Sequence, residues 1–397
     1  MLVQFKMKNV LSFKEETIFD MTAISAYKEH TSNLIDIDKK EKFLRVAAIY
    51  GANASGKSNF VCAMRFFQRI IVESLNNVDD GAEPILEKYS MPFSFEDKME
   101  NSEFEIVEII DNEEYQYGFE YNSESIVMEW LYKKNLDTNR KVTIFERTTQ
   151  EVSLGASVRK ECEAYKDQIP SETLVLSFFN KLKLKTDIYK KVYTGIMDIL
   201  VLSSDACENT GVLNAILPQI IDNEKEELLE FLAAIDTGIK NISYDENEKE
   251  IIFYTFHKGA DGEMYPLNLY NESEGTIKSI MLFIYAKTAI YKDGMIVIDE
   301  LNVKLHPLLL KFIIDLFYNN DSKAQLIYTT HDTTLMDKKF FRRDQIWFVQ
   351  KDDLGHSELC ALSDFKVRSD ASFEKDYLSG VYGGIPFLKD FSLKAGE

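Results

Sequence analysis

The residues of this chain best suited to chemistry are concentrated in one stretch, Gly51-Ala-Asn-Ala-Ser-Gly-Lys-Ser58. The apolar segment Leu44–Tyr50 before it indicates a buried strand, and the amphipathic stretch from Asn59 to about Asn76 indicates a helix. A Gly-x-x-x-x-Gly-Lys-Ser loop between a strand and a helix is the setting in which backbone N–H groups bind phosphate. The pattern therefore predicts a loop for a nucleoside triphosphate. The alternative is an ordinary turn rich in Gly, Ser and Asn.

Each residue type in this loop has a physical reason to be there. The glycines free the backbone so that consecutive N–H groups can point at phosphate oxygens, and the following helix adds the positive end of its dipole. Lys57 is expected to reach the β- and γ-phosphates, and the Ser58 hydroxyl to ligate Mg²⁺. The loop residues predicted to bind the nucleotide are Gly51, Asn53, Ser55, Gly56, Lys57, Ser58 and Asn59.

A pair of acidic residues, Asp299 and Glu300, directly follows the apolar run Met295–Ile298. Ligands of open parallel sheets bind at the carboxyl ends of the strands, so these carboxylates are expected to face the phosphates. Asp299 is predicted to hold Mg²⁺ opposite Ser58, and Glu300 to orient and deprotonate an attacking water. The alternative is a strand that ends in solvated acids, and the phosphate-loop pattern elsewhere in the chain favours the catalytic interpretation.

Two weaker motifs flank this acidic pair in the sequence. His331 follows the apolar strand Gln325–Thr329, where it is predicted to contact the γ-phosphate; alternatively it is an ordinary surface residue. Ser273 precedes the expected helix that leads into the acidic strand, and with Gly275 it would expose a hydroxyl and N–H groups together. Alternatively, this motif is only a capped helix start. The position of both motifs around Asp299 favours a role in the same site.

Composition restricts the partners of the chain. Its 397 residues carry a formal net charge of -20, which repels nucleic acid on average although basic clusters occur at 181–191 and 338–343. Nucleic acid therefore stays open as a partner without being indicated by the charge. No segment approaches the roughly 20 apolar residues that span a bilayer, so no membrane partner is expected. The four cysteines form no Cys-x-x-Cys pair, which favours a reducing cytoplasm.

Hydrophobic periodicity divides the chain into segments of different character. Alternating strands dominate the first ~145 residues, as in an antiparallel meander, and helical spacing dominates 156–240, including an expected helix from Ile188 to Leu202. Apolar strands then alternate with helices, which predicts an α/β fold with a parallel sheet covered on both faces. The predicted domains are 1–150 and 248–364 as two lobes, 151–247 as a helical insertion, and 365–397 as a tail.

The motifs, in this order, resemble those of the ATP-binding-cassette (ABC) ATPases, in the soluble branch that includes RecF-type and SMC-type proteins. The phosphate loop corresponds to Walker A, Ser273-Glu-Gly-Thr276 to the signature, Asp299-Glu300 to Walker B, and His331 to the switch histidine. Within that branch the chain is similar to the AAA-type, OLD-like ATPases of abortive-infection and anti-phage systems. The stretch from Asp299 to His306-Pro and the tail from Arg368 to Pro386 carry this similarity.

Two departures from the branch pattern are visible. The signature lacks the Leu-Ser-Gly-Gly form, and Asn302 stands where many relatives carry Asp. The resemblance implies an ABC-type P-loop fold with a mixed sheet, an antiparallel β lobe and a helical insertion. It also implies ATP and Mg²⁺ as cofactors, with hydrolysis in a head-to-tail homodimer to which Ser273 and Gly275 contribute in trans.

The resemblance further implies a biological role. The chain is expected to be the sensor or regulatory ATPase of an anti-phage system that controls a separate effector, a toxin or a nuclease. The alternatives are a DNA-repair or DNA-processing ATPase of the RecF/SMC type and a GTP-specific switch protein. The helical insertion and the tail are the expected partner surfaces. The alternative for both is packing within the chain, with the tail's aromatic residues covering the sheet.

Overall fold

A six-stranded mixed sheet forms the centre of the molecule. The computed structural model describes residues 1–37, 41–75, 84–95, 100–204, 210–247, 250–368 and 371–386. The strand order is β11-β15-β16-β5-β17-β18; the strands from β11 to β17 run parallel, and β18 is antiparallel to β17. The strands are β5 (Val46–Tyr50), β11 (Ile199–Leu202), β15 (Met295–Ile298), β16 (Gln325–Thr330), β17 (Ile346–Lys351) and β18 (Ser357–Ala361).

Both faces of this sheet are covered, as the apolar strands predict. All five residues of β5 are buried: Ala47 and Ile49 join one hydrophobic core, and Val46, Ala48 and Tyr50 join the other. Successive side chains of a strand point to opposite faces, so a strand that is apolar throughout must separate two cores. The first core contains α1 (Lys57–Glu73), α4 (Val175–Lys181) and α5 (Ile188–Met197), and the second contains α7 (Glu274–Lys292) and α8 (Pro307–Tyr318).

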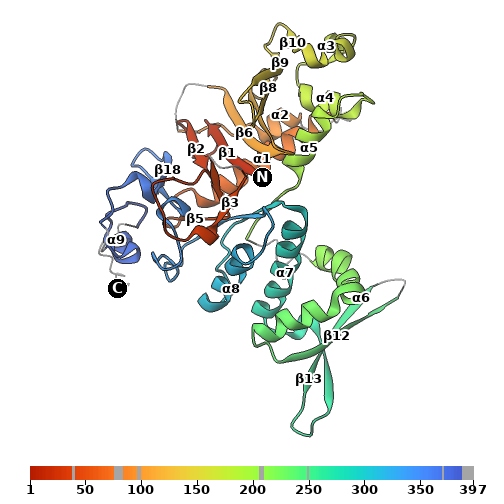
Figure 1. Cartoon of the computed structure of the whole chain (residues 1–397), viewed down its shortest axis with the longest axis vertical. Coiled ribbons are helices and arrows are strands. Elements are labelled where there is room, and N and C mark those ends of the chain that lie inside the picture. The colour runs from red at the N-terminus through yellow and green to blue at the C-terminus, as the bar shows by residue number, and fades with distance from the viewer. Residues whose placement is uncertain are drawn as a thin grey trace, which may run out of the picture.

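An antiparallel sheet lies against the first core, which confirms the predicted β lobe (Figure 1). Its strand order is β10-β9-β8-β7-β6-β1-β2. Aromatic side chains join it to α1; the rings of Phe67 and Phe119, for example, stack at 5.7 Å. The strands are β1 (Leu2–Lys8), β2 (Thr17–Asp20), β6 (Ser102–Ile110), β7 (Glu113–Tyr121), β8 (Ile126–Asn135), β9 (Lys141–Arg147) and β10 (Val152–Leu154).

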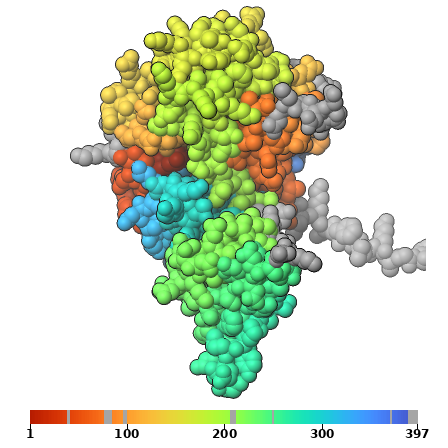
Figure 2. Space-filling model, turned by 90° about the vertical axis from the view of Figure 1, so that its right-hand side faces the viewer, coloured from red at the N-terminus to blue at the C-terminus, as the bar shows by residue number. Residues whose placement is uncertain are grey.

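A third unit projects from the α7 side of the molecule as a tapering extension (Figures 1 and 2). It consists of α6 (Thr210–Ala234), which is interrupted at Glu224, and the antiparallel strands β12 (Ile239–Glu246), β13 (Ile251–Lys258) and β14 (Met264–Asn268). The remaining short elements are β3 (Leu34–Asp36), β4 (Lys42–Leu44), α2 (Ile85–Tyr89), α3 (Ala156–Cys162) and α9 (Phe373–Leu378). Among the described residues, no helix is both long and apolar enough to cross a membrane.

One predicted element is wrong. The stretch from Ile188 to Leu202 was expected to be helical, but α5 ends at Met197 and Ile199–Leu202 forms β11, paired in parallel with β15. The periodicity of a short apolar run fits either a helix or a buried strand. Here the run forms a strand because it pairs with β15 of the central sheet. The expected helix after the phosphate loop is present as α1, although Asn76, its expected end, lies outside the described residues.

The described part of the tail packs on the sheet. Tyr377 and Tyr382 are buried, and their rings stack on Phe348 of β17 at 5.2 and 5.4 Å. The tail also reaches the start of the phosphate loop, where Gly384 lies against Gly51. The Tyr377 hydroxyl fixes Gly384 by donating a hydrogen bond of 2.9 Å to its carbonyl. Packing is therefore the observed role of these aromatic residues. Residues 387–397 of the predicted tail lie outside the described part of the chain.

Candidate functional site

The loop that joins β5 to α1 borders a pocket of about 450 Å³ at the carboxyl end of the central sheet. Six predicted site residues meet there, five from the loop and its helix and one from the end of β15. They are Asn53, Gly56, Lys57, Ser58, Asn59 and Glu300. Ala54 and Lys351 complete the lining. The two segments lie more than 240 residues apart in the sequence, so the fold creates this pocket as the parallel sheet predicts.

Lys351 was missed by the sequence analysis, although a signal for it exists. It ends β17, which runs parallel to β5 with Phe348 opposite Tyr50, so Lys351 lies beside the start of the phosphate loop. A residue at the carboxyl end of a parallel strand lies where ligands of such a sheet bind. The argument used for Asp299 therefore applies equally to Lys351, which adds a second cationic side chain to the pocket.

Two serines from distant segments, Ser12 and Ser357, support the phosphate loop. Ser357 of β18 places its Oγ 2.6 Å from the Ser55 carbonyl and 2.7 Å from the Ser12 Oγ. The Asn59 side chain donates to the same Ser12 Oγ at 2.7 Å. Gly56 has a φ of +117°, and a Cβ there would collide with Ser357. Glycine is thus required both for the backbone conformation and for the close approach of β18.

Lys57 is bound to its own loop. Its ammonium group donates to the Gly51 carbonyl at 2.7 Å and to the Ala52 carbonyl at 2.9 Å. Burial lowers the pKa of Lys57, while the nearby carboxylates of Glu300 and Asp299 act in the opposite direction. To contact a phosphate, this ammonium must exchange the two carbonyl oxygens for phosphate oxygens. A charged acceptor favours that exchange because hydrogen bonds between two charged groups are the stronger ones.

The acidic pair is organised by Thr329 of the neighbouring strand β16. The Thr329 hydroxyl donates to Asp299 Oδ1 at 2.5 Å and accepts the Glu300 N–H at 2.8 Å. Asp299 is buried behind this contact, whereas half-buried Glu300 lines the pocket. Glu300 has a φ of +49°, the left-handed region, which turns the chain sharply at the end of β15. Thr329 was missed because nothing in the sequence distinguishes it from any other threonine in a strand.

The oxygen atoms of the Ser58 and Asp299 side chains are chemically suited to bind a magnesium ion. Mg²⁺ prefers hard oxygen ligands and is usually held by one or two protein groups together with phosphate oxygens. Ser58 borders the pocket, and Asp299 directly precedes Glu300, which lines the same pocket. Ser58 and Asp299 are therefore the groups that would hold the ion.

His331 is tied to the loop that follows the acidic pair. Its Nε2 lies 3.4 Å from the Asn302 side-chain nitrogen, and Asn302 Oδ1 accepts the Thr330 hydroxyl at 2.8 Å. His331 itself is exposed and does not line the pocket of the phosphate loop. Asn302, the departure from the branch pattern, is thus the residue that holds the predicted switch histidine.

The predicted signature residues lie outside this pocket. Ser273 Oγ accepts the Thr276 N–H at 3.1 Å, which confirms Ser273 as the N-cap of α7. Ser273 is exposed, and within the described part of the chain the pocket lining contains no residue of α7. Gly275 lies against the loop after the acidic pair, since a Cβ there would come within 2.9 Å of the Lys304 carbonyl. One chain therefore keeps the signature motif apart from its own phosphate loop.

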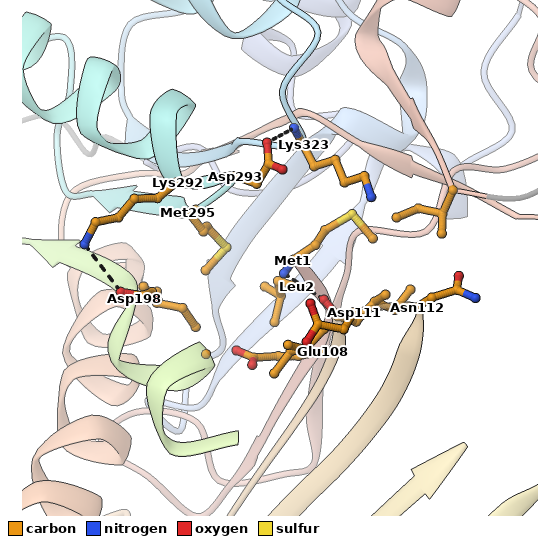
Figure 3. A pocket seen from close by; sticks show the side chains of 16 residues that line it. Met1, Leu2, Glu108, Asp111, Asn112, Asp198, Lys292, Asp293, Met295 and Lys323 are labelled. Atoms are coloured by element: carbon orange, nitrogen blue, oxygen red, sulfur yellow. Dashed lines mark hydrogen bonds and ion pairs between the residues drawn. The ribbon is translucent and has the colours of Figure 1, made fainter. Parts of the chain in front are cut away.

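A second cavity, of about 360 Å³, lies at the other end of the parallel strands, near their amino ends (Figure 3). It borders the first residues of β11 and β15, whereas the phosphate loop follows the last residue of β5. Charged side chains line it, including Glu108, Asp198 and Lys292, and it contains no predicted site residue. Glu108 is 3% exposed, and burial raises its pKa to about 7.

Comparison with known proteins gives one family match. Residues 46–160 and 206–337, more than half of the chain, match the model AAA_21, described as "AAA domain, putative AbiEii toxin, Type IV TA system". A search of curated proteins found no match. Among solved structures, the "SMC head domain from Thermotoga maritima" is 15% identical, covers 91% of this chain and 98% of its own, and has a TM-score of 0.42. The "SmcHead bound to the C-winged helix domain of ScpA" is 14% identical, covers 94% and 99%, and has a TM-score of 0.44.

Proposed function

We propose that this chain, which belongs to the AAA_21 family, binds ATP with Mg²⁺ and hydrolyses it. The family membership confirms the resemblance predicted from the motifs. The observation that carries the proposal is the pocket in which Lys57 and Ser58 of the phosphate loop meet Glu300 from the end of β15. A phosphate-binding loop that faces a carboxylate is the arrangement required to transfer a phosphoryl group to water.

In this proposal, the phosphate loop and Lys57 bind the phosphates, and Glu300 transfers the proton. The N–H groups of the loop and the Lys57 ammonium bind the phosphate oxygens and stabilise the charge that develops on them. Glu300 is the general base: its carboxylate orients a water molecule and accepts its proton as the water attacks the γ-phosphorus. Ser58 and Asp299 would hold Mg²⁺, which would neutralise part of the phosphate charge. Thr329 keeps Asp299 and the Glu300 backbone in place.

The active form is proposed to be a head-to-tail homodimer. The pocket contains the phosphate loop and Glu300 but no residue of α7 within the described chain, while the N-terminus of α7 is exposed. A helix N-terminus presents free N–H groups and a positive dipole end, which favour an anion such as a γ-phosphate. Ser273 and Gly275 of a second copy would complete the site, so that ATP joins the two subunits and hydrolysis releases them.

The test is nucleotide-dependent dimerisation of the Glu300→Gln variant. Gln keeps the size of the side chain but cannot accept a proton, so the variant should bind ATP, hydrolyse it at least 100-fold more slowly and accumulate as a dimer. Light scattering after size exclusion, with and without ATP and Mg²⁺, measures the mass, and phosphate release measures turnover. Wild-type turnover in this variant would remove Glu300 from the role of base. A monomer at saturating ATP would exclude the dimer.

For the biological role, we propose a regulatory ATPase of an anti-phage or toxin–antitoxin system that controls a separate toxin or nuclease. The support is the family description, which names a type IV toxin–antitoxin system, together with the acidic charge of the chain, which is unfavourable for a free-standing DNA clamp. Co-expression with the product of the adjacent gene, during phage challenge, tests this role. Protection should require Lys57. Turnover that depends on DNA, without any effector, would instead favour a DNA-processing ATPase.

A further inference from the structure

The loop Glu300–Leu305 contacts the end of β16, His331 and the N-terminal part of α7. At its start, the Thr329 hydroxyl accepts the Glu300 N–H at 2.8 Å and the Thr329 carbonyl accepts the Leu301 N–H at 3.1 Å. In its middle, Asn302 contacts both Thr330 and His331. Two hydrogen bonds within the loop, each of 3.1 Å, form successive tight turns. The Val303 N–H donates to the Glu300 carbonyl, and the Leu305 N–H donates to the Asn302 carbonyl. The loop is thus a compact unit that carries Glu300.

The N-terminal part of α7 is attached to the other side of this loop. Gly275 allows the helix to approach until a Cβ would be 2.9 Å from the Lys304 carbonyl. At the surface, Lys304 pairs with Glu274 at 3.4 Å. Lys304 has a φ of +64°, so its backbone is held in the left-handed region at the point of contact. The first turn of the signature helix therefore rests on the residues that follow Glu300.

Lys278 forms the buried part of this attachment. It is 5% exposed, and its ammonium group donates to the Val303 carbonyl at 2.7 Å and lies 3.5 Å from the Glu300 carbonyl. A buried ammonium is costly unless hydrogen bonds satisfy it, so the helix and the loop hold one another in a defined position. Lys278 lies one helical turn after Gly275, on the same side of α7.

We propose that Lys278 is a positioning residue that couples the two ATP sites of the dimer, a proposal that rests on the function given above. A γ-phosphate bound by the partner contacts the N-terminus of α7. Through Lys278, the position of that helix sets the position of the loop that carries Glu300. Each subunit's base is therefore oriented when its signature helix is engaged by the other subunit's nucleotide. The two sites hydrolyse ATP together rather than independently.

The first experiment uses Lys278→Met, which keeps the apolar stem and removes the ammonium donor. Because misplacing a catalytic group by about 1 Å costs on the order of 100-fold, kcat should fall about 10- to 100-fold while KM stays within about 2-fold, and the Hill coefficient for ATP should fall to about 1. The matched control is Lys287→Met, which removes a lysine of the same helix that pairs with Glu224 and Glu227 at the surface. It should behave like the wild type, and Lys278→Arg should recover most of the activity.

Hydrogen exchange without nucleotide tests the attachment separately from hydrolysis. In Lys278→Met, the amides of Val303 and Leu305 should exchange faster than in the wild type, whereas Lys287→Met should leave them unchanged. Unchanged exchange would refute the attachment whatever the turnover. If exchange is faster in Lys278→Met but the wild-type chain proves not to hydrolyse ATP, the proposed function is overturned while the contact stands. If Lys278→Met does not fold, Lys278→Gln, with a neutral donor on a shorter stem, should show the same faster exchange.

Mixed dimers decide whether Lys278 acts on Glu300 of its own subunit. A Glu300→Gln subunit, which still binds ATP, paired with a Lys278→Met subunit leaves one working base, the Glu300 of the Lys278→Met subunit, while both phosphate loops can hold ATP. Turnover should be about 10-fold or more below that of a wild-type and Glu300→Gln pair. Placing both substitutions in one subunit, opposite a wild-type subunit, should preserve turnover. Equal losses in both arrangements would show that Lys278 only supports the signature helix, and would overturn the proposal.

Discussion

The two halves of the proposed composite site differ in how firmly one chain holds them. The phosphate-loop half is supported by Ser12 and Ser357 from distant segments, and its Lys57 is bonded to the loop itself. The signature half ends in an exposed serine whose side chain caps its own helix. The difference indicates that the half that binds nucleotide is preorganised within a chain. In the proposed dimer, the half that completes the site must stay accessible, because its ligand would arrive on the partner chain.

The largest effect is expected for Lys57→Ala in the phosphate-loop half. Hydrogen bonds between charged groups contribute up to about 3 kcal/mol, so the affinity for ATP should fall on the order of 100-fold. Calorimetric titration with ATP and Mg²⁺ measures this loss. Lys292→Ala, a lysine that pairs with Asp198 on the far edge of the sheet, is the matched control. Equal affinities of wild type and Lys57→Ala would mean that the loop is not the binding half.

A bulky residue at Ser273 should distinguish the two halves by lowering turnover without weakening ATP binding. Ser273→Phe leaves the phosphate loop of its own chain intact, so the monomer should bind ATP normally while turnover falls roughly 10- to 100-fold, the range of a lost transition-state contact. Ser372→Phe makes the same change at another N-cap, that of α9, and should leave turnover unchanged. Weaker ATP binding by the Ser273→Phe monomer would contradict the assignment of the two halves to different chains.

A smaller effect is expected at Thr329, which holds the acidic pair beside the phosphate loop. Thr329→Val preserves the shape of the side chain but removes the hydroxyl between Asp299 and the Glu300 N–H. The loss of such hydrogen bonds costs about 1 to 2 kcal/mol, so turnover should fall roughly 5- to 30-fold with little change in ATP affinity. Steady-state phosphate release gives both parameters. Thr330→Val, which alters the Asn302 contact instead, shows whether His331 contributes separately.

The smallest effect on ATP chemistry is expected at Glu108, in the cavity remote from both halves (Figure 3). Burial raises the pKa of Glu108 from 4.5 to about 7, opposed by the amino group of Met1 and reinforced by Asp198. Between these pH values the unfolded chain loses the proton while the folded chain keeps it. The free energy of unfolding therefore falls as the pH rises, by up to about 3 kcal/mol above pH 7.

Glu108→Gln removes this titration. Urea unfolding should show the variant more stable than the wild type at pH 8, with the advantage shrinking as the pH falls towards 5. ATP turnover at pH 8 and at low temperature should equal that of the wild type. A pH profile of stability identical in both proteins would show that Glu108 does not titrate in this range. A change in turnover would link the remote cavity to the site.

Much of the site could be predicted because its parts are local in sequence. A strand, a glycine-rich loop and a helix follow one another directly, so Gly56, Lys57 and Ser58 could be identified from spacing alone. Thr329 and Lys278 could not be, because each has an ordinary residue type and a partner from another segment. Ile199–Leu202 was assigned to a helix for the same reason: its apolar run fits either element, and only its pairing with β15 decides.

The sequence alone determined the chemistry of this protein: a phosphate loop, a carboxylate at the end of an apolar strand, and a capped helix before it. Those features follow from residue type and short-range geometry, which the chain carries wherever it lies. The tertiary structure decided which of them share a pocket. Parallel pairing brings Glu300 and Lys351 to the phosphate loop, while α7 presents Ser273 elsewhere, held through Lys278 to the loop that carries Glu300. Contacts between segments hundreds of residues apart depend on packing and register, and these exist only in the folded chain.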